Sequence, residues 1–91
     1  FGLDQNFPNP FNPSTTIRFD LPAASRVSIV VYDVTGREVA SLVQGEYGAG
    51  SYSTTLDASQ MASGVYFYRM MAFGDNGAAP FVSTNKLLLL K

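Results

Sequence analysis

The sequence predicts an all-β fold, an immunoglobulin-like β-sandwich of about seven short antiparallel strands. Two observations lead to this prediction. Apolar and polar side chains alternate over several segments, which is typical of half-buried strands. Glycine, proline and Asx clusters recur between those segments at the spacing expected for turns. The chain has 91 residues and 46% hydrophobic residues, which suffices for one compact domain and is too short for two.

The first predicted strands differ in the faces that they bury. Thr15 to Leu21 alternates cleanly and ends at Pro22, so we expect a half-exposed strand. Val27 to Val34 is apolar on both faces, which predicts a central strand covered on both sides. Asp33 to Arg37 then forms a turn, in which Gly36 is available for a positive φ.

The middle of the chain returns from that turn. Glu38 to Val43 is expected to be the second arm of the hairpin, and Gln44 to Gly50, with three glycines, a flexible loop. Ser51 to Leu56 alternates again and predicts a strand. Asp57 is placed to be the N-cap of one short helical turn that runs to Met61.

The last third of the chain predicts two more strands. Val65 to Phe73 is the strongest prediction, because consecutive aromatic residues fit both faces of a pleat. Gly74 to Gly77 predicts a turn, which offers too few oxygen ligands for calcium and is better explained as a plain turn. Phe81 to Leu90 predicts a final strand, interrupted near Ser83 to Asn85.

The composition argues against catalysis, cofactors and nucleic acid. The chain has no histidine and no cysteine, so the usual general bases, nucleophiles and metal ligands are missing. Asp20, Asp33 and Asp57 each lie at the end of a predicted strand, where turn capping or exposure to water explains them better than a catalytic pair does. The net charge is -1, and the six basic residues are scattered along the chain, which disfavours a phosphate-binding surface. We expect a non-enzyme with no small-molecule substrate.

The most informative segments lie at the two ends of the chain. In Asn6 to Asn12 (NFPNPFN), alternating prolines stiffen the backbone, so that Phe7 and Phe11 are expected to anchor the segment against the sandwich. Asn9 and Asn12 are expected to bond backbone groups. In Lys86 to Lys91 (KLLLLK), leucines point to both faces, which requires cover from neighbours or from a partner. Such a strand suits strand addition or docking in a groove.

These residues resemble a known family. The chain is similar, end to end, to the C-terminal sorting domain of type IX (Por) secretion, type A, which exported proteins of the Bacteroidetes and related phyla carry. The resemblance rests on the following stretches: Gln5 to Pro22, Val31 to Val43, Ala49 to Tyr52, Asp57 to Met70, and Lys86 to Lys91.

The resemblance implies a cleavable C-terminal sorting signal. A cargo protein would be fused N-terminally, so that residues 1–91 are one sorting domain cut from a longer exported protein. Outer-membrane components of the secretion system would recognise the domain, and a C-terminal-signal peptidase would remove it after passage through the periplasm, leaving the cargo on the cell surface or releasing it. The recognition motifs that the resemblance assigns are Pro8, Asn9, Pro10, Phe11, Gly36, Arg37, Gly64, Val65, Tyr66, Phe67, Lys86, Leu87, Leu88, Leu89, Leu90 and Lys91.

Two alternatives stay open from the sequence. The first is an immunoglobulin-like accessory or spacer module of an extracellular enzyme, in which the leucines from Leu87 to Leu90 would be buried within the sandwich. The second is a carbohydrate-binding module that uses Tyr47, Tyr52 and Tyr66 as stacking residues. Sorting makes a different prediction: deletion of Leu87 to Lys91 traps a fused cargo in the periplasm.

Overall fold

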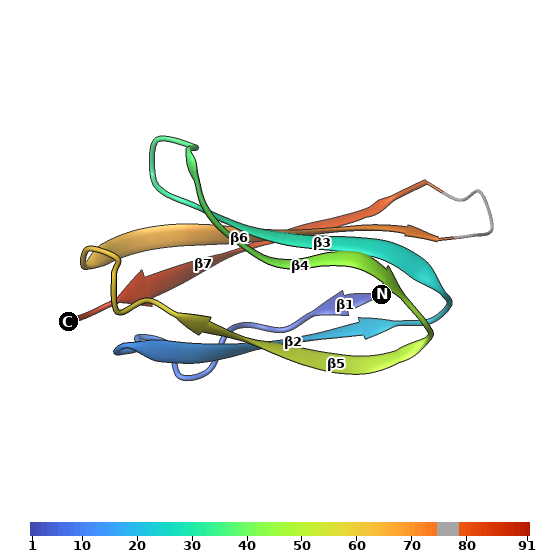
Figure 1. Cartoon of the computed structure of the whole chain (residues 1–91), viewed down its shortest axis with the longest axis horizontal. Coiled ribbons are helices and arrows are strands. Elements are labelled where there is room, and N and C mark those ends of the chain that lie inside the picture. The colour runs from blue at the N-terminus through green and yellow to red at the C-terminus, as the bar shows by residue number, and fades with distance from the viewer. Residues whose placement is uncertain (75–78) are drawn as a thin grey trace.

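The computed structural model describes residues 1–74 and 79–91, which form two antiparallel sheets packed face to face (Figure 1). One sheet has the strand order β1-β2-β5 and the other the order β4-β3-β6-β7. The strands are β1 (Gly2–Leu3), β2 (Ser14–Leu21), β3 (Ser25–Tyr32), β4 (Glu38–Tyr47), β5 (Gly50–Asp57), β6 (Gly64–Gly74) and β7 (Phe81–Leu89). This arrangement confirms the predicted all-β sandwich.

The core lies between the sheets and follows the alternation of the sequence. In β2, Ile17, Phe19 and Leu21 are buried, as expected. The other fully buried apolar side chains come mainly from the four-stranded sheet. They include Val27, Ile29, Val31, Tyr68, Met70, Leu87 and Leu89. One face of each sheet therefore supplies the core, and the opposite face points outward.

The prediction that β3 is covered on both sides is wrong. The strand is central, between β4 and β6, and its inward side chains are buried. Its outward side chains Val30 and Tyr32 are only half-buried, and Val34 lies beyond the strand with 69% of its surface exposed. The sandwich has two layers, so that nothing in the described part of the chain covers the outer face of β3.

The prediction of a loop over Gln44 to Gly50 is also wrong. Strand β4 continues to Tyr47, because Gly45 and Tyr47 pair with Val27 and Ser25 of β3. These ladder hydrogen bonds outweigh the flexibility of glycine, an example of tertiary context overriding propensity. The connection to β5 is only the short turn at Gly48 and Ala49.

Two smaller expectations also differ. After Asp57 the chain makes a β-turn rather than a helical turn, with the N–H of Met61 donating to the carbonyl of Ala58 at 3.0 Å. Asp57 does accept a bond from the N–H of Ser59, at 3.0 Å. Strand β7 runs without interruption, because Ser83 to Asn85 pair with β6. The turn predicted at Gly74 to Gly77 lies, beyond Gly74, outside the described residues.

Candidate functional site: one end of the sandwich

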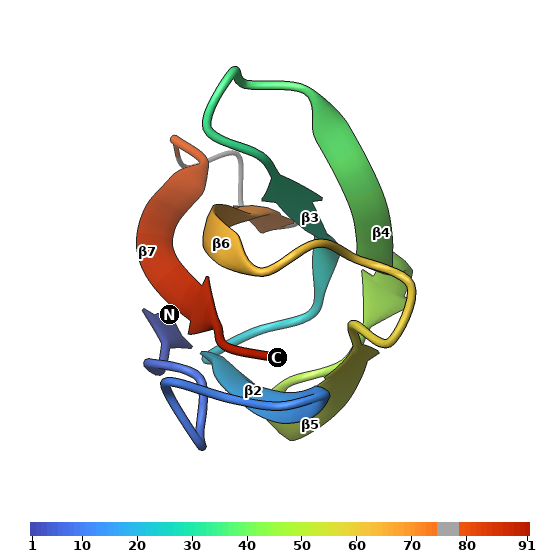
Figure 2. The same cartoon turned by 90° about the vertical axis from the view of Figure 1, so that its left-hand side faces the viewer.

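The four segments that carry the predicted recognition residues come together at one end of the sandwich. This end is on the left in Figure 1 and faces the viewer in Figure 2. We call it the motif end. It consists of the opening segment Pro8 to Phe11, the β3–β4 turn with Gly36 and Arg37, the start of β6 from Gly64 to Phe67, and the last residues Lys86 to Lys91. Gly64 pairs with Leu89 and Phe67 with Lys86, so the start of β6 and the end of β7 are direct neighbours.

The closing strand is held on both of its edges. Strand β6 pairs with one edge, and the opening segment with the other. The N–H of Phe11 donates to the carbonyl of Leu88, and the N–H of Leu90 donates to the carbonyl of Phe11, both at 3.0 Å. The N–H of Leu88 donates to Oδ1 of Asn9 at 3.0 Å, and Nε2 of Gln5 donates to the carbonyl of Lys86 at 2.7 Å. The stretch from Lys86 to Leu90 is therefore not an open edge for strand addition.

The four leucines have different environments. Leu87 and Leu89 are fully buried in the core, Leu88 is half-buried, and Leu90 is 51% exposed. The domain itself therefore covers the inward face of the closing strand. Of the two explanations that the sequence left open, cover by neighbours is confirmed for Leu87 and Leu89, whereas Leu90 is exposed.

The opening segment is anchored by Phe11 rather than by both phenylalanines. Phe11 is 2% exposed, whereas Phe7 is 81% exposed, so the expected anchoring role of Phe7 is wrong. Phe7 pairs with Thr16 through its backbone, which turns its side chain outward. Asn9 bonds the backbone of β7, as expected. Asn12 is exposed and bonds no backbone group within the part that the structure describes.

A buried polar contact that the sequence reasoning missed shapes this segment. Asn6 is buried, and its Nδ2 donates to the carbonyl of Pro8 at 3.1 Å and to Oγ1 of Thr15 at 3.0 Å. The hydroxyl of Thr15 also donates to the carbonyl of Pro8, at 2.8 Å. A signal for this contact exists in the sequence: a proline-rich stretch keeps its carbonyl acceptors while it lacks N–H donors, so nearby amide side chains must donate.

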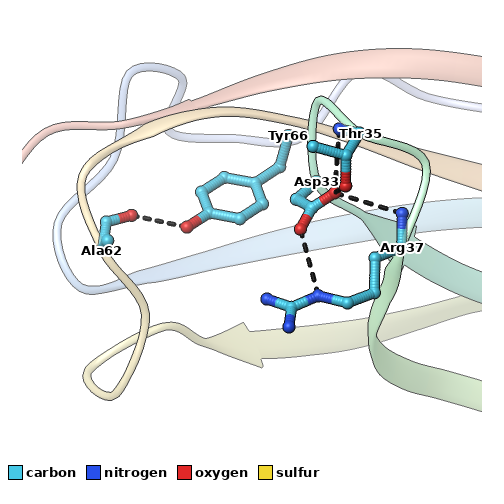
Figure 3. A network of polar contacts seen from close by, with 5 residues as sticks. All are labelled: Asp33, Thr35, Arg37, Ala62 and Tyr66. Atoms are coloured by element: carbon cyan, nitrogen blue, oxygen red, sulfur yellow. Dashed lines mark hydrogen bonds and ion pairs between the residues drawn. The ribbon is translucent and has the colours of Figure 1, made fainter.

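The β3–β4 turn is organised around the carboxylate of Asp33 (Figure 3). Its Oδ1 accepts bonds from the hydroxyl of Thr35 at 2.6 Å, from the N–H of Thr35 at 2.9 Å and from the N–H of Arg37 at 3.1 Å. Nε of Arg37 donates to Oδ2 at 3.2 Å. The Thr35 hydroxyl, followed by the bonds and charge of Arg37, lowers the pKa of Asp33. Gly36 has a φ of 88°, which confirms the expected positive φ.

A cleft of about 450 Å³ connects this turn with the loop that precedes β6. It is lined by Arg37, Glu38, Val39, Gln60, Met61, Ala62 and Tyr66. The ring of Tyr66 is buried, and its hydroxyl donates to the carbonyl of Ala62 at 2.6 Å, which fixes the loop (Figure 3). Lys91 also holds this loop, with Nζ donating to the carbonyl of Ser59 at 2.7 Å. The turn, the loop and the start of β6 thus line one continuous surface.

The tyrosines proposed for carbohydrate stacking do not share a surface. Tyr47 and Tyr52 contact each other edge to face, with ring centroids 5.2 Å apart, and Tyr52 stacks on the buried Phe19 at 5.4 Å. Tyr66 lies at the motif end with its ring buried. A flat sugar-binding platform needs exposed rings side by side, so these three residues do not form one.

The fold, with strand orders β1-β2-β5 and β4-β3-β6-β7, defines an immunoglobulin-like sandwich domain. The family model of the secretion system C-terminal sorting domain matches residues 5–79, which is most of the chain. The chain therefore belongs to the family of type IX secretion system C-terminal sorting domains. Such a domain is a non-catalytic signal that targets cargo proteins for secretion across the outer membrane and interacts with the type IX machinery.

The match covers three of the four segments of the motif end and stops before Lys86 to Lys91. No curated protein and no solved structure matches the chain. Within the described residues, no group of histidine, cysteine or acidic side chains is arranged to hold a metal ion, and no helix is long and apolar enough to cross a membrane.

Proposed function

We propose that the motif end is the surface by which outer-membrane components of the type IX system recognise this domain. The observation that carries the proposal is that four segments far apart in the sequence meet there, three of them joined by backbone pairing. Residues 1–91 act in this proposal as one sorting domain that follows an N-terminally fused cargo.

The burial of the sixteen predicted residues suggests which of them stabilise the motif end and which contact the secretion machinery. Four of them are buried, namely Phe11, Tyr66, Leu87 and Leu89. In the proposal these four hold the end together. The exposed ones make the contacts, and they are Pro8, Asn9, Pro10, Gly36, Arg37, Lys86, Leu90 and Lys91. The half-buried ones, Gly64, Val65, Phe67 and Leu88, lie between the two groups. Because the opening segment occupies the edge of β7, the machinery reads the surface of the folded end rather than adding a strand there.

After export, a C-terminal-signal peptidase separates the domain from its cargo, which remains on the cell surface or is released. This step is part of the proposal and follows from the family to which the domain belongs. No nucleic acid or small-molecule substrate enters the proposal.

A secretion assay with point variants tests the proposal more sharply than truncation does. Deletion of Leu87 to Lys91 would also remove two core leucines and unfold the domain. Leu90→Asp instead changes an exposed side chain at the motif end. A reporter with an export signal for the inner membrane and this domain at its C-terminus should then accumulate in the periplasm of a bacterium that carries the type IX system.

The matched control is Ala23→Asp, which places the same charge on an exposed residue between β2 and β3, at the opposite end of the sandwich (Figure 1). This variant should be secreted normally. Equal secretion of the two variants, with both domains folded by circular dichroism, would rule out the motif end as the recognition surface.

The accessory-module alternative retains one supporting observation, the burial of Leu87 and Leu89 within the sandwich. In that case the domain would stay attached to its cargo outside the cell. Mass spectrometry of the secreted reporter distinguishes the two: the sorting function predicts that peptides of residues 1–91 are absent from the exported protein, and a spacer predicts that they are present.

A further inference from the structure

The opening segment lies along the outer edge of β7, the end strand of the four-stranded sheet (Figure 2). Phe11 makes two backbone bonds there. Its N–H donates to the carbonyl of Leu88, and its carbonyl accepts from the N–H of Leu90, both at 3.0 Å. This is the bonding pattern of two parallel strands, with Phe11 opposite Leu89.

Two amide side chains continue this pattern ahead of Phe11. If the parallel pairing went on, the backbone of residue 9 would accept from the N–H of Leu88 and donate to the carbonyl of Lys86. Oδ1 of Asn9 accepts the first of these bonds at 3.0 Å, and Nε2 of Gln5 donates the second at 2.7 Å. The opening segment therefore bonds the edge of β7 as a strand would, partly through side chains.

The opening segment itself offers few bonds to a further strand. Pro8 and Pro10 have no N–H to donate. The carbonyl of Pro8 already accepts from Nδ2 of Asn6 at 3.1 Å and from the hydroxyl of Thr15 at 2.8 Å. Proline at the edge of a sheet obstructs the addition of another strand. The opening segment therefore covers the edge of β7 without creating a new edge.

The two end strands of the four-stranded sheet differ in how they obstruct pairing. The pairing of β4 with β3 shifts register at two places, and exposed Glu38 and Glu46 lie near the two ends of β4. Irregular pairing and charge both protect an edge strand from association. Strand β7 pairs with β6 without a register shift and ends in three uncharged leucines, Leu87 to Leu89. This stretch has neither feature, and it is the stretch that the opening segment covers.

Without this cover, the edge of β7 is complementary to the same edge of a second copy. Leu88 directs both its N–H and its carbonyl away from β6, so two copies related by a two-fold axis at Leu88 can pair antiparallel there. Lys86 would lie opposite Leu90 of the other copy, and Lys91 opposite Asn85. This register places no like charges directly opposite each other, which would oppose pairing.

We propose that the opening segment is an edge cover that prevents β7 from pairing with β7 of a second copy and so keeps the domain monomeric. Gln5 and Asn9 complete the cover in this proposal, because they bond the two backbone groups of β7 that precede the bridge to Phe11. The proposal concerns self-association and does not depend on recognition by the secretion machinery.

Sedimentation velocity over a wide range of concentration tests the proposal. The unchanged domain should remain a monomer throughout. The double variant Gln5→Ala with Asn9→Ala removes both amide bonds, and both side chains are exposed, so the core stays intact. This variant should form a dimer whose share grows with concentration. At low concentration its Leu88 N–H should exchange with solvent roughly fivefold faster, the effect of losing one hydrogen bond. Asn9→Ala alone should show the same changes to a smaller extent.

The matched control is Asn12→Ala, which removes another exposed amide of the neighbouring chain and should leave the domain monomeric. Lys86→Pro, added to the double variant, should abolish the dimer, because residue 86 directs its backbone away from β6 and proline has no N–H. Three results would overturn the proposal: a dimer of the unchanged domain, variants at Gln5 and Asn9 that fold by circular dichroism and remain monomeric at every concentration, or a dimer that persists with Lys86→Pro.

Discussion

Phe11 and Leu88 are joined backbone to backbone, with the N–H of Phe11 donating to the carbonyl of Leu88 at 3.0 Å. This bond ties the opening segment of the domain to its closing strand. The buried ring of Phe11 belongs to the same core as Leu87 and Leu89. The two ends of the chain therefore stabilise each other, and the surface that we propose for recognition depends on both.

Phe11→Ala should lower the free energy of unfolding by about 3 to 5 kcal/mol, the range for truncating a buried phenylalanine. The ring is 2% exposed and packs in the core, so its loss leaves a cavity. Urea denaturation followed by circular dichroism measures the change. Phe7→Ala is the matched control: with 81% of its surface exposed, Phe7 should contribute less than about 0.5 kcal/mol. Equal effects of the two substitutions would contradict the anchoring role of Phe11.

The contrast between these two phenylalanines shows how far the sequence could predict this site. Alternation correctly predicted β2 with its inward residues and most of the later strands, and the glycine correctly predicted the turn at Gly36. The pattern of prolines gave no information on which ring turns inward, because that depends on the pairing of Phe7 with Thr16 and of Phe11 with Leu89. Pairings between distant segments are properties of the assembled fold, not of local propensity.

Pairing between distant segments also explains the other differences between the predicted and the observed fold. The glycines after Gln44 indicate flexibility, but the pairing of β4 with β3 extends the strand through Gly45. The two-sided apolar pattern of β3 correctly predicted a central strand, whereas its outer face lies open because the sandwich has no third layer. That apolar pattern was thus informative about a surface, although the sequence alone suggested a core.

Asn6→Ala should destabilise the domain by about 1 to 3 kcal/mol, because the substitution leaves buried polar groups without partners. Nδ2 of Asn6 donates to both Thr15 and Pro8, and Thr15 bonds the same Pro8 carbonyl. Residues that share one hydrogen-bond network are energetically coupled. In a double-mutant cycle measured by urea denaturation, Asn6→Ala and Thr15→Val should therefore cost less together than the sum of their single effects. Strict additivity would show that the two side chains act independently.

Gly36→Ala should destabilise the domain by about 1 to 2 kcal/mol, since a residue with a Cβ is strained at the φ of 88° that the turn requires. A Cβ at this position would meet no atom within 4 Å, so any loss arises from the backbone conformation alone. Gly48→Ala, in the β4–β5 turn, is the control, because that glycine lacks a left-handed φ. Thermal unfolding should show a lower Tm for the first variant only.

The carboxyl group of Asp33 should titrate below its ordinary pKa of 3.8. The folded pKa lies below the unfolded value, so this group stabilises the fold above the unfolded pKa, and that contribution is lost as the pH falls through the folded pKa. The hydroxyl of Thr35 is the largest cause of the lowering, ahead of Arg37. Carbon-13 NMR titration of the side chain should accordingly show a larger upward shift of the pKa in Thr35→Val than in Arg37→Gln. The opposite ranking would mean that charge, rather than hydrogen bonding, organises the turn.

The phenol of Tyr68 should ionise at a higher pH than its ordinary pKa would give. Burial raises its pKa above the ordinary value of 10.0, and the bond from Asn85 Nδ2 only partly opposes this effect. Because the folded pKa is the higher one, the stabilising contribution is complete below the unfolded pKa and is lost as the pH rises through the folded value. Ultraviolet titration of tyrosinate should show a late ionisation step that disappears in Tyr68→Phe. Tyr32→Phe, which changes a ring on the outer face, should leave that late step in place. Loss of the late step in Tyr32→Phe would contradict its assignment to Tyr68.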